Sequence, residues 1–310
     1  MRQAMRDAYW DRIYELAKND RDIVIVSADF GAPSLDKFRR DFPNQYINTG
    51  ISEQNAVLLA TGLALAGKKP IAYAITQFIT LRCFEQIRIY PCGMDLPVTI
   101  VGVGAGACYW ESGSTHHSFE QLSIMRTLPN LETVNCTDCH MAKEAADFTV
   151  HASGPKFIQM DREVIDGIYR GTIDFKKGYS FLTAKNENMV ISTGNMTKEA
   201  MDILNHAELD FGIMDIYKFP VDTESLKAEL EGVKNIITLE EGAREGGLGS
   251  YILEILSDYE IRIPVHRIAL NTYDGYAASY NYGGREEIRK GYGMGRKDIL
   301  RVIGKEFARQ

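Results

Sequence analysis

Short apolar runs alternate along the chain with segments whose apolar residues recur at helical spacing. Residues 2–19 show the helical spacing, and the uninterrupted apolar run Ile23–Val26 is typical of a buried parallel strand. Ser52 stands where it can cap a further helix that runs through Leu63. The other elements predicted in the first half are a glycine-containing turn over 29–34, helices over 79–90 and 142–150, and strands over 71–75, 98–103 and 156–159.

The second half repeats this alternation after a more polar, glycine-containing stretch. That stretch, over 162–188, is typical of a connection between domains. The elements predicted after it are strands over 189–192, 211–217, 235–240 and 265–268 and helices over 198–205, 223–230 and 250–257. Residues 271–295, rich in tyrosine and glycine, are expected to be irregular. The pattern predicts two α/β domains, 1–165 and 188–310, joined by a linker over 166–187, with mostly parallel sheets flanked by helices.

The composition is that of an ordinary globular protein. The 310 residues are 45% hydrophobic and carry a formal net charge of −7, which argues against a nucleic-acid binder. No apolar run approaches the roughly 20 residues that span a bilayer, and the first residues lack the apolar core of a signal peptide. We therefore expect a cytoplasmic protein with no membrane partner, whose five cysteines are free thiols.

The best candidate for chemistry lies where the helix after Ser52 begins. Gly50 allows a tight turn, and Glu53 falls in the first helical turn, where the helix dipole favours a carboxylate. Spacing alone leaves two interpretations open. Glu53 is either an acidic residue of the capping turn or a catalytic carboxyl group.

Residues 136–140 spell the C-x-x-C-H pattern of covalent haem attachment. That chemistry normally needs an exported protein, and the chain has no second ligand pair spaced for zinc. Asp138 suits the N-cap of the following helix instead. The pattern therefore favours a helix start, and we expect no metal ligands in this chain.

Several segments together resemble a known family. Residues 48–66, NTGISEQNAVLLATGLALA, resemble the pyrimidine-domain signature of transketolase-type, thiamine-diphosphate-dependent enzymes. Similar to other elements of that family, and in the same order, are residues 27–29, 113–130 and 240–249. The resemblance implies a pyrimidine-binding domain over 1–165 and a transketolase C-terminal domain over 188–310.

The resemblance also implies how the cofactor is held. The glutamate that matches Glu53 hydrogen-bonds N1′ of the aminopyrimidine, for which its carboxyl group must hold or share a proton. An aromatic platform is expected from Phe78, with Phe84 as a second wall, although the chain has one more residue than the family segment between Phe78 and Arg82. Both phenylalanines could instead be plain core residues. The cofactor contacts expected from the resemblance are Asp29, Ile51, Glu53, Phe78, Arg82 and Phe84.

For the substrate, the resemblance points to His116, which matches a histidine that shuttles a proton at the substrate carbonyl or hydroxyl. An anion pocket is expected from Arg2, Ser34 and Arg162, and a sugar phosphate, a sulfonate or a carboxylate would suit its charge. The alternative is that these arginines are surface residues without a ligand. Ser112 is a further expected substrate contact, although it replaces a family aspartate.

Two other positions depart from the family pattern. Ser114 replaces a proline, and Gly104 stands where transketolases place another substrate histidine. The donor and acceptor sugars are therefore expected to differ from the usual pentose and hexose phosphates.

One family element is missing from the sequence. The diphosphate-binding domain of full-length transketolases uses a G-D-G segment to hold Mg²⁺, and the chain has no such segment. The resemblance therefore implies a separate N-terminal subunit that supplies the Mg²⁺ ligands, an α2β2 heterotetramer in which this chain dimerises, and no activity of the single chain.

The expected reaction is transfer of a two-carbon ketol unit from a ketose to an aldose acceptor. Two alternatives share the fold: a 1-deoxy-D-xylulose-5-phosphate-synthase-like enzyme and the β subunit of a 2-oxoacid dehydrogenase. A catalytically silent regulatory partner is the non-enzyme alternative, which the intact Glu53 argues against.

Overall fold

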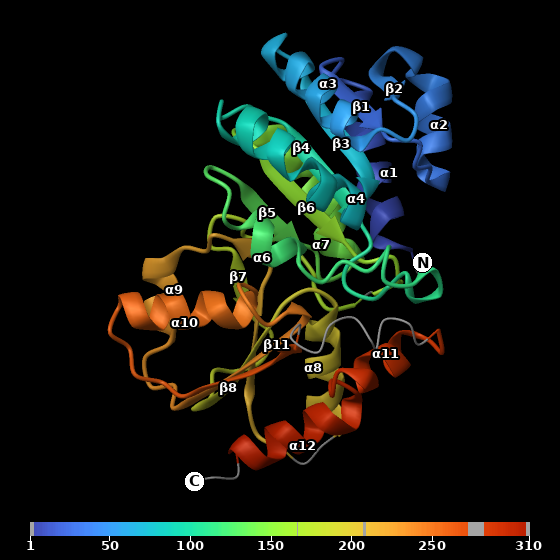
Figure 1. The fold of residues 1–310 in the computed structure, drawn as a ribbon. Helices are drawn as coiled ribbons and strands as arrows, with labels where there is room; N and C mark the ends of the chain where they lie inside the picture. Colours follow the sequence, from blue (N-terminus) through green and yellow to red (C-terminus); the bar gives the residue numbers. More distant parts are fainter. Residues whose placement is uncertain (1–2, 166, 207–208, 272–281, 308–310) are drawn as a thin grey trace. The chain divides into compact units, whose positions relative to one another are not determined.

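The computed structural model describes residues 3–165, 167–206, 209–271 and 282–307 and divides them into two compact units (Figure 1). The first comprises residues 1–105 and 124–173, and the second comprises 106–123 and 174–310. Segment 106–123 thus packs with the second unit although it lies within the first half of the sequence. None of the helices in the described ranges is long and apolar enough to cross a membrane.

The first unit is built on a parallel sheet whose strands follow the order β5-β6-β4-β3-β1-β2. Its central strands are buried on both faces, which explains their continuous apolar runs. Helix α3 packs against β3, and α1 packs against α7. The strands are β1 (Ile23–Ser27), β2 (Tyr46–Asn48), β3 (Lys69–Ile75), β4 (Thr99–Val103), β5 (Glu132–Asn135) and β6 (Lys156–Met160). The α-helices are α1 (Met5–Ala17), α2 (Pro33–Asp41), α3 (Glu53–Leu65), α4 (Thr76–Thr80), α5 (Phe84–Ile87), α6 (Gln121–Met125), of which the last two residues belong to this unit, and α7 (Cys139–His151).

The second unit holds a smaller sheet in the order β12-β11-β8-β9-β7, in which only β7 is antiparallel to its neighbour. One apolar cluster lies against α8 and α12 and another against α9 and α10. The strands are β7 (Tyr179–Phe181), β8 (Asn188–Ser192), β9 (Gly212–Ile216), β10 (Lys218–Phe219), β11 (Asn235–Ala243) and β12 (Val265–Leu270). The helices are α8 (Asn195–His206), α9 (Thr223–Glu229), α10 (Leu248–Asp258), α11 (Arg285–Gly291) and α12 (Arg296–Phe307).

The predicted fold class, two α/β domains with mostly parallel sheets, is confirmed, but some local predictions are wrong. The single helix expected over 79–90 is broken into α4, a 3₁₀ turn η2 (Leu81–Cys83), α5 and a π turn η3 (Arg88–Cys92). The tail expected to be irregular contains α11, and the expected linker contains β7. Ser52 occupies the N-cap position of α3, but its hydroxyl donates to the Thr49 carbonyl at 2.7 Å and does not cap a helical amide.

Candidate active site

The turn between β2 and α3 is fixed by one side chain, that of Asn48. Its Oδ1 accepts from the amides of Asp29 (3.2 Å) and Gly50 (2.9 Å), and its Nδ2 donates to Asp29 Oδ1 at 3.0 Å. Gly50 has φ +70°, a conformation that other residues rarely adopt. Asp29 itself has φ +55° and is exposed where β1 ends. The turn therefore sets Ile51 and Glu53 beside the carboxyl ends of β1 and β2.

Glu53 is buried in the first turn of α3 and, among the described residues, pairs with the guanidinium of Arg82. Its side chain is 4% exposed, and its Oε2 lies 3.0 Å from Nη1 of Arg82, whose side chain is 47% exposed. The Arg82 carbonyl accepts from Gln54 Nε2 at 2.9 Å, which ties the η2 turn to α3. The carboxylate thus has a partner that can be reached from solvent.

An aromatic ring lies next to this pair. The Arg82 guanidinium carbon is 4.4 Å from the centre of the Phe78 ring, a cation–π distance. The structure therefore brings together three of the predicted cofactor residues: Glu53, Arg82 and Phe78. Ile51, 81% exposed, adds an apolar side chain just before the helix.

Phe84 has a different environment. It is half-buried and packs against the apolar core of the first unit, which fits its interpretation as a core residue. Burial, reinforced by the Glu53 charge, raises the pKa of the neighbouring Cys83 thiol to about 12, so this cysteine is an unreactive packing residue.

His116 and Ser112 lie on the loop 106–118, which packs with the second unit. The amide of His116 donates to the Gly113 carbonyl at 3.0 Å, and its Nδ1 is 2.9 Å from Thr115 Oγ1. Burial lowers the pKa of His116, while the Glu111 carboxylate acts in the opposite direction. The ring is therefore neutral at pH 7, as a proton acceptor must be. Ser112 is exposed at the end of a 3₁₀ turn.

His117, the neighbouring histidine, is buried. Neither of its ring nitrogens makes a hydrogen bond of normal geometry to a described residue. Burial lowers its pKa, and the nearby Glu241 carboxylate opposes that shift. A buried neutral ring that packs near Phe119 is a structural neighbour of His116.

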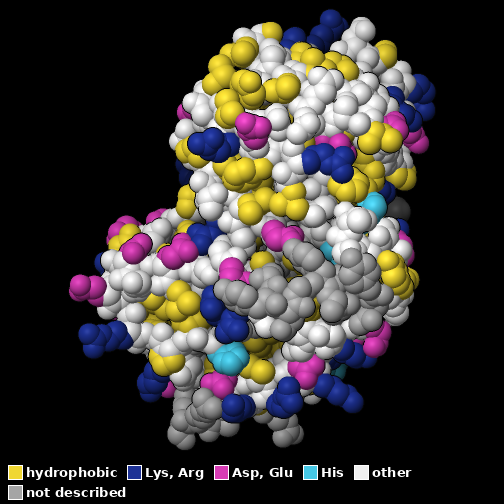
Figure 2. All heavy atoms as spheres, viewed as in Figure 1, with side chains coloured by type: hydrophobic (Ala, Val, Ile, Leu, Met, Phe, Trp, Pro, Cys, Tyr) yellow, Lys and Arg dark blue, Asp and Glu magenta, His cyan; other side chains and the backbone are white. Residues whose placement is uncertain are grey.

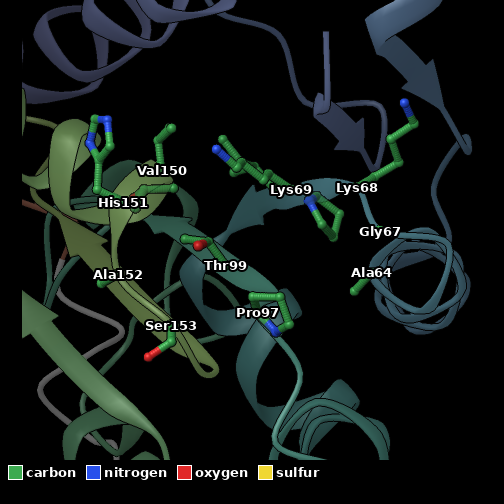
Figure 3. A pocket seen from close by; sticks show the side chains of 13 residues that line it. Ala64, Gly67, Lys68, Lys69, Pro97, Thr99, Val150, His151, Ala152 and Ser153 are labelled. Atoms are coloured by element: carbon green, nitrogen blue, oxygen red, sulfur yellow. The ribbon is translucent and has the colours of Figure 1, made fainter. Parts of the chain in front are cut away.

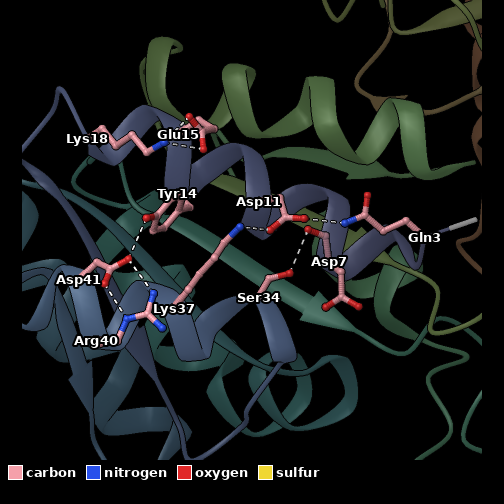
Figure 4. A network of polar contacts seen from close by, with 10 residues as sticks. All are labelled: Gln3, Asp7, Asp11, Tyr14, Glu15, Lys18, Ser34, Lys37, Arg40 and Asp41. Carbon is pink, nitrogen blue, oxygen red and sulfur yellow. Dashed lines mark hydrogen bonds and ion pairs between the residues drawn. The ribbon is translucent and has the colours of Figure 1, made fainter. Parts of the chain in front are cut away.

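The residues expected to form an anion pocket have differing surroundings. Ser34, in the first turn of α2, donates from Oγ to the Asp7 carbonyl at 3.4 Å (Figure 4). The nearby Asp11 carboxylate is held by Lys37 at 2.5 Å, so the local charge is balanced rather than positive. Arg162 is exposed just after β6, and Arg2 lies outside the described residues. The anion pocket stays a prediction.

Gly104 follows β4 with φ +115°, a conformation in which a side chain is strained. A glycine at this position, where the resemblance leads one to expect a histidine, suits the observed backbone conformation.

The C-x-x-C-H segment is a helix start. Asp138 caps α7 by accepting from the Met141 amide at 2.9 Å, and its other oxygen accepts from the amides of Ile168 (3.1 Å) and Tyr169 (2.8 Å). No disulfide joins the five cysteines, all of which lie in the described ranges. Within those ranges, no group of three or more His, Cys, Asp and Glu side chains is arranged to hold a metal ion.

A pocket of about 400 Å³ lies at the opposite edge of the first sheet (Figure 3). It is lined by the first residues of β3 and β4 and by the last turns of α3 and α7. Its two lysines, Lys68 and Lys69, pair with Asp22 and Asp20. Ligands of parallel α/β sheets bind at the carboxyl ends of the strands, so the candidate site is at the Glu53 edge and not in this pocket.

Sequence reasoning missed one group of residues, the partners of Glu241. This buried carboxylate, at the end of β11, binds Arg285, Arg289, Asn195 and the Ala107 amide. The only sequence signal was the Glu240-Glu241-Gly242 segment, which gave no indication of partners 44 and 48 residues away.

Comparison with known proteins identifies the family of both domains. The transketolase pyrimidine-binding domain model matches residues 1–166, and the transketolase C-terminal domain model matches 180–299. An apulose-4-phosphate transketolase subunit from Phocaeicola vulgatus is 29% identical over 306 residues, with 96% of each chain covered. The 6-deoxy-6-sulfo-D-fructose transketolase subunit SqwH from Clostridium sp. is 27% identical, with 96% of this chain and 92% of that one covered.

A solved structure described as a split-gene transketolase in an inactive β4 tetramer is 28% identical, with a TM-score of 0.85 and 98% of both chains covered. The relatives are themselves single subunits of about the same extent, and they match this chain through both domains. The chain therefore belongs to the transketolase family and carries its pyrimidine-binding domain followed by its C-terminal domain.

Proposed function

We propose that this chain is the C-terminal subunit of a split, thiamine-diphosphate-dependent transketolase. The observation that carries the proposal is the buried Glu53 carboxylate at the carboxyl edge of the sheet, paired with Arg82 beside the Phe78 ring. The reaction is transfer of a two-carbon ketol unit from a ketose to an aldose.

The residues around Glu53 fit the aminopyrimidine of thiamine diphosphate. A carboxyl group with one solvent-accessible partner can turn to a ring nitrogen, and Phe78 and Ile51 offer apolar surface to a flat heterocycle. When bound, the cofactor supplies the nucleophilic carbon that accepts the two-carbon unit. Glu53 holds a proton at N1′, while Arg82 orients the carboxyl group. Mg²⁺ would accompany the diphosphate on the partner subunit.

His116 acts on the substrate. Its neutral ring accepts a proton from a substrate hydroxyl, and the protonated ring returns a proton to the oxygen formed from the reacting carbonyl. The Thr115 hydroxyl at Nδ1 orients the ring. Positioned proton transfer of this kind is typically worth about 10²–10⁴ in rate. Ser112 contacts the acceptor.

The sugar is anionic. The relatives named for apulose 4-phosphate and 6-deoxy-6-sulfo-D-fructose act on a phosphate and a sulfonate by their names, and Arg162 and Arg2 offer guanidinium groups to either. Because Ser112 and Gly104 replace an aspartate and a histidine of the usual pattern, the donor and acceptor sugars differ from the usual pentose and hexose phosphates.

An apolar surface on the first unit supports association with other subunits. Leu58 and Leu65 lie seven residues apart on one face of α3, which forms a stripe along the helix. Apolar side chains gather in several places on the face of this unit seen in Figure 2. The exposed large apolar residues of the unit include Ile51, Leu58, Leu65, Leu81, Ile89, Tyr90 and Met94. This surface suits dimerisation of the chain and binding of a diphosphate-domain partner in an α2β2 assembly.

The test is a substrate screen on the chain co-expressed with a protein that carries the G-D-G diphosphate-binding domain. We expect transfer of two carbons from a ketose phosphate or sulfonate to an aldose. Condensation of pyruvate with an aldose phosphate would instead identify a synthase, and turnover of a branched or other 2-oxo acid would identify a dehydrogenase subunit. Cofactor binding by the complex without any turnover would identify a regulatory partner.

A further inference from the structure

The loop that carries Ser112 and His116 is closed at its base. Gly106 and Ser118 form an antiparallel bridge in which each amide donates to the other residue's carbonyl, at 3.1 and 2.9 Å. Whatever holds this base therefore sets the position of the whole loop.

The carboxylate of Glu241, in the C-terminal domain, reaches this base. Oε2 of Glu241 accepts from the Ala107 amide at 3.2 Å, and it also accepts from Asn195 Nδ2 at 3.0 Å. The Glu241 side chain is 3% exposed. A buried charge of this kind needs close countercharges.

Two arginines of α11 supply them. Arg285, whose side chain is 6% exposed, places Nε 3.0 and 3.1 Å from the two oxygens, and Arg289, 14% exposed, places Nε 2.6 Å from Oε1. Burial alone would raise the pKa of Glu241, but the two guanidinium charges lower it well below its usual value. The carboxylate is therefore ionised, and both of its oxygens accept hydrogen bonds.

The loop approaches the carboxylate so closely that only glycine fits. A Cβ on Gly106 would stand 1.9 Å from Glu241 Oε2, and Gly106 has φ +56°. Beyond the loop, the Ala243 amide donates to the Phe119 carbonyl at 2.7 Å, which continues the attachment to β11.

We propose that the cluster of Glu241, Arg285 and Arg289 is a positioning device for the substrate loop 106–118. It fixes the base of the loop and thereby the orientation of His116 and Ser112. The inference rests on the proposed function, because only that function gives the loop a substrate. Under this proposal the C-terminal domain contributes to catalysis by positioning the loop, although the cluster itself contains no catalytic residue.

The test compares Glu241→Gln with Glu240→Gln. Glu240 is the adjacent buried carboxylate, but it accepts from the Leu248 and Gly249 amides at the start of α10. Hydrogen exchange is measured on the free full-length chain, and steady-state kinetics on the complex with the diphosphate-domain partner. In Glu241→Gln we expect faster exchange over 106–118, and a kcat lower by about 10²-fold, the loss typical of a misplaced catalytic group, with cofactor binding unchanged.

Three further variants distinguish a loss of loop positioning from simple misfolding. Arg289→Lys keeps the charge at the less buried arginine and should recover part of the kcat that Arg289→Met loses. Gly106→Ala disturbs the same contact from the loop side and should reproduce the faster exchange of Glu241→Gln.

Unchanged loop exchange in both Glu241→Gln and Gly106→Ala would overturn the proposal. So would an equal loss of kcat in Glu240→Gln at the same melting temperature. Absence of turnover in the wild-type complex would overturn the proposed function alone, because the exchange measurement does not depend on turnover.

Discussion

Two buried carboxylates, one in each unit, are held in opposite ways. Glu53 and Glu241 have side chains that are 4% and 3% exposed. Glu53 pairs with Arg82, which is half exposed, whereas Glu241 is enclosed by two largely buried arginines, an asparagine amide and a backbone amide.

This difference distinguishes a carboxylate whose partner can be replaced from a carboxylate whose partners are fixed. A carboxylate whose oxygens are all engaged by buried donors is rigid and cannot exchange partners without a large cost. A carboxylate with one solvent-reachable partner can take up a ligand atom in its place. We therefore propose that Glu53 serves the chemistry and that Glu241 serves to hold the structure around it.

The largest effect is expected from Glu53→Gln in the complex with the partner subunit. An amide cannot hold the proton at N1′, so turnover should fall by about 10²–10⁴, equivalent to roughly 3–5 kcal/mol of transition-state stabilisation. The melting temperature should stay close to that of the wild type, because Gln has nearly the same size as Glu and Arg82, the partner in the ion pair, is half exposed. Glu85→Gln, on the exposed face of α5, is the matched control. Full recovery of activity with excess cofactor would assign Glu53 to binding only.

Glu241→Ala should instead act on stability. Removing one member of a buried ion cluster leaves Arg285 and Arg289 uncompensated, which costs about 3–5 kcal/mol of unfolding free energy in urea titrations. The lowered pKa of Glu241 determines the direction in which the unfolding free energy changes with pH. The stabilisation is complete above the ordinary carboxyl pKa of 4.5 and is lost as the pH falls below it. A stability change as small as that of Glu254→Ala, an exposed carboxyl on α10, would contradict the comparison.

Arg82→Met tests the half-exposed partner of Glu53. We expect about a tenfold loss of turnover from the misoriented carboxyl group, and a change in unfolding free energy below about 1 kcal/mol, since partly exposed ion pairs contribute little. Arg82→Lys should restore part of the activity. A stability loss comparable to that of Glu241→Ala would show that the two carboxylates are held alike.

The smallest effect concerns the histidines beside the Glu241 cluster. Burial lowers the pKa of both His116 and His117, so the unfolded chain binds more protons than the folded chain below about pH 6.5. Stability should therefore be complete above that pH and fall by at most about 1.4 kcal/mol per pH unit for each group as the pH decreases. Melting curves of His117→Asn between pH 5 and 8 should show a flatter slope. A slope equal to that of the wild type would place the pH dependence elsewhere.

The strands and most helices of both units could be predicted from the sequence. Runs such as Ile23–Val26 are apolar because parallel strands are buried on both faces, and Asp138 is a cap because a short acceptor before a helix can reach its third amide. The break of the expected helix between α4 and η3 could not be predicted from the sequence. A change from α to 3₁₀ geometry leaves the spacing of the apolar residues almost unchanged.

The buried carboxylates also differ in how far the sequence predicts their surroundings. Glu53 stands in a local motif, and its position in the first turn of α3 follows from residues next to it. Glu241 depends on α11 and on the loop after Gly106, which are far from it in sequence, so no local pattern could indicate its partners. The same holds for the packing of segment 106–123 with the second unit.

The central claim is that this chain supplies the catalytic carboxyl group of an enzyme completed by a second subunit. The most direct test is to titrate the purified chain, wild type or Glu53→Gln, with the diphosphate-domain subunit and to measure ketol transfer at saturating thiamine diphosphate and Mg²⁺. We predict no transfer by the chain alone, saturating activity at equal subunit numbers for the wild type, and binding without appreciable activity for Glu53→Gln. Transfer by the single chain, or full activity of the Glu53→Gln complex, would contradict the account.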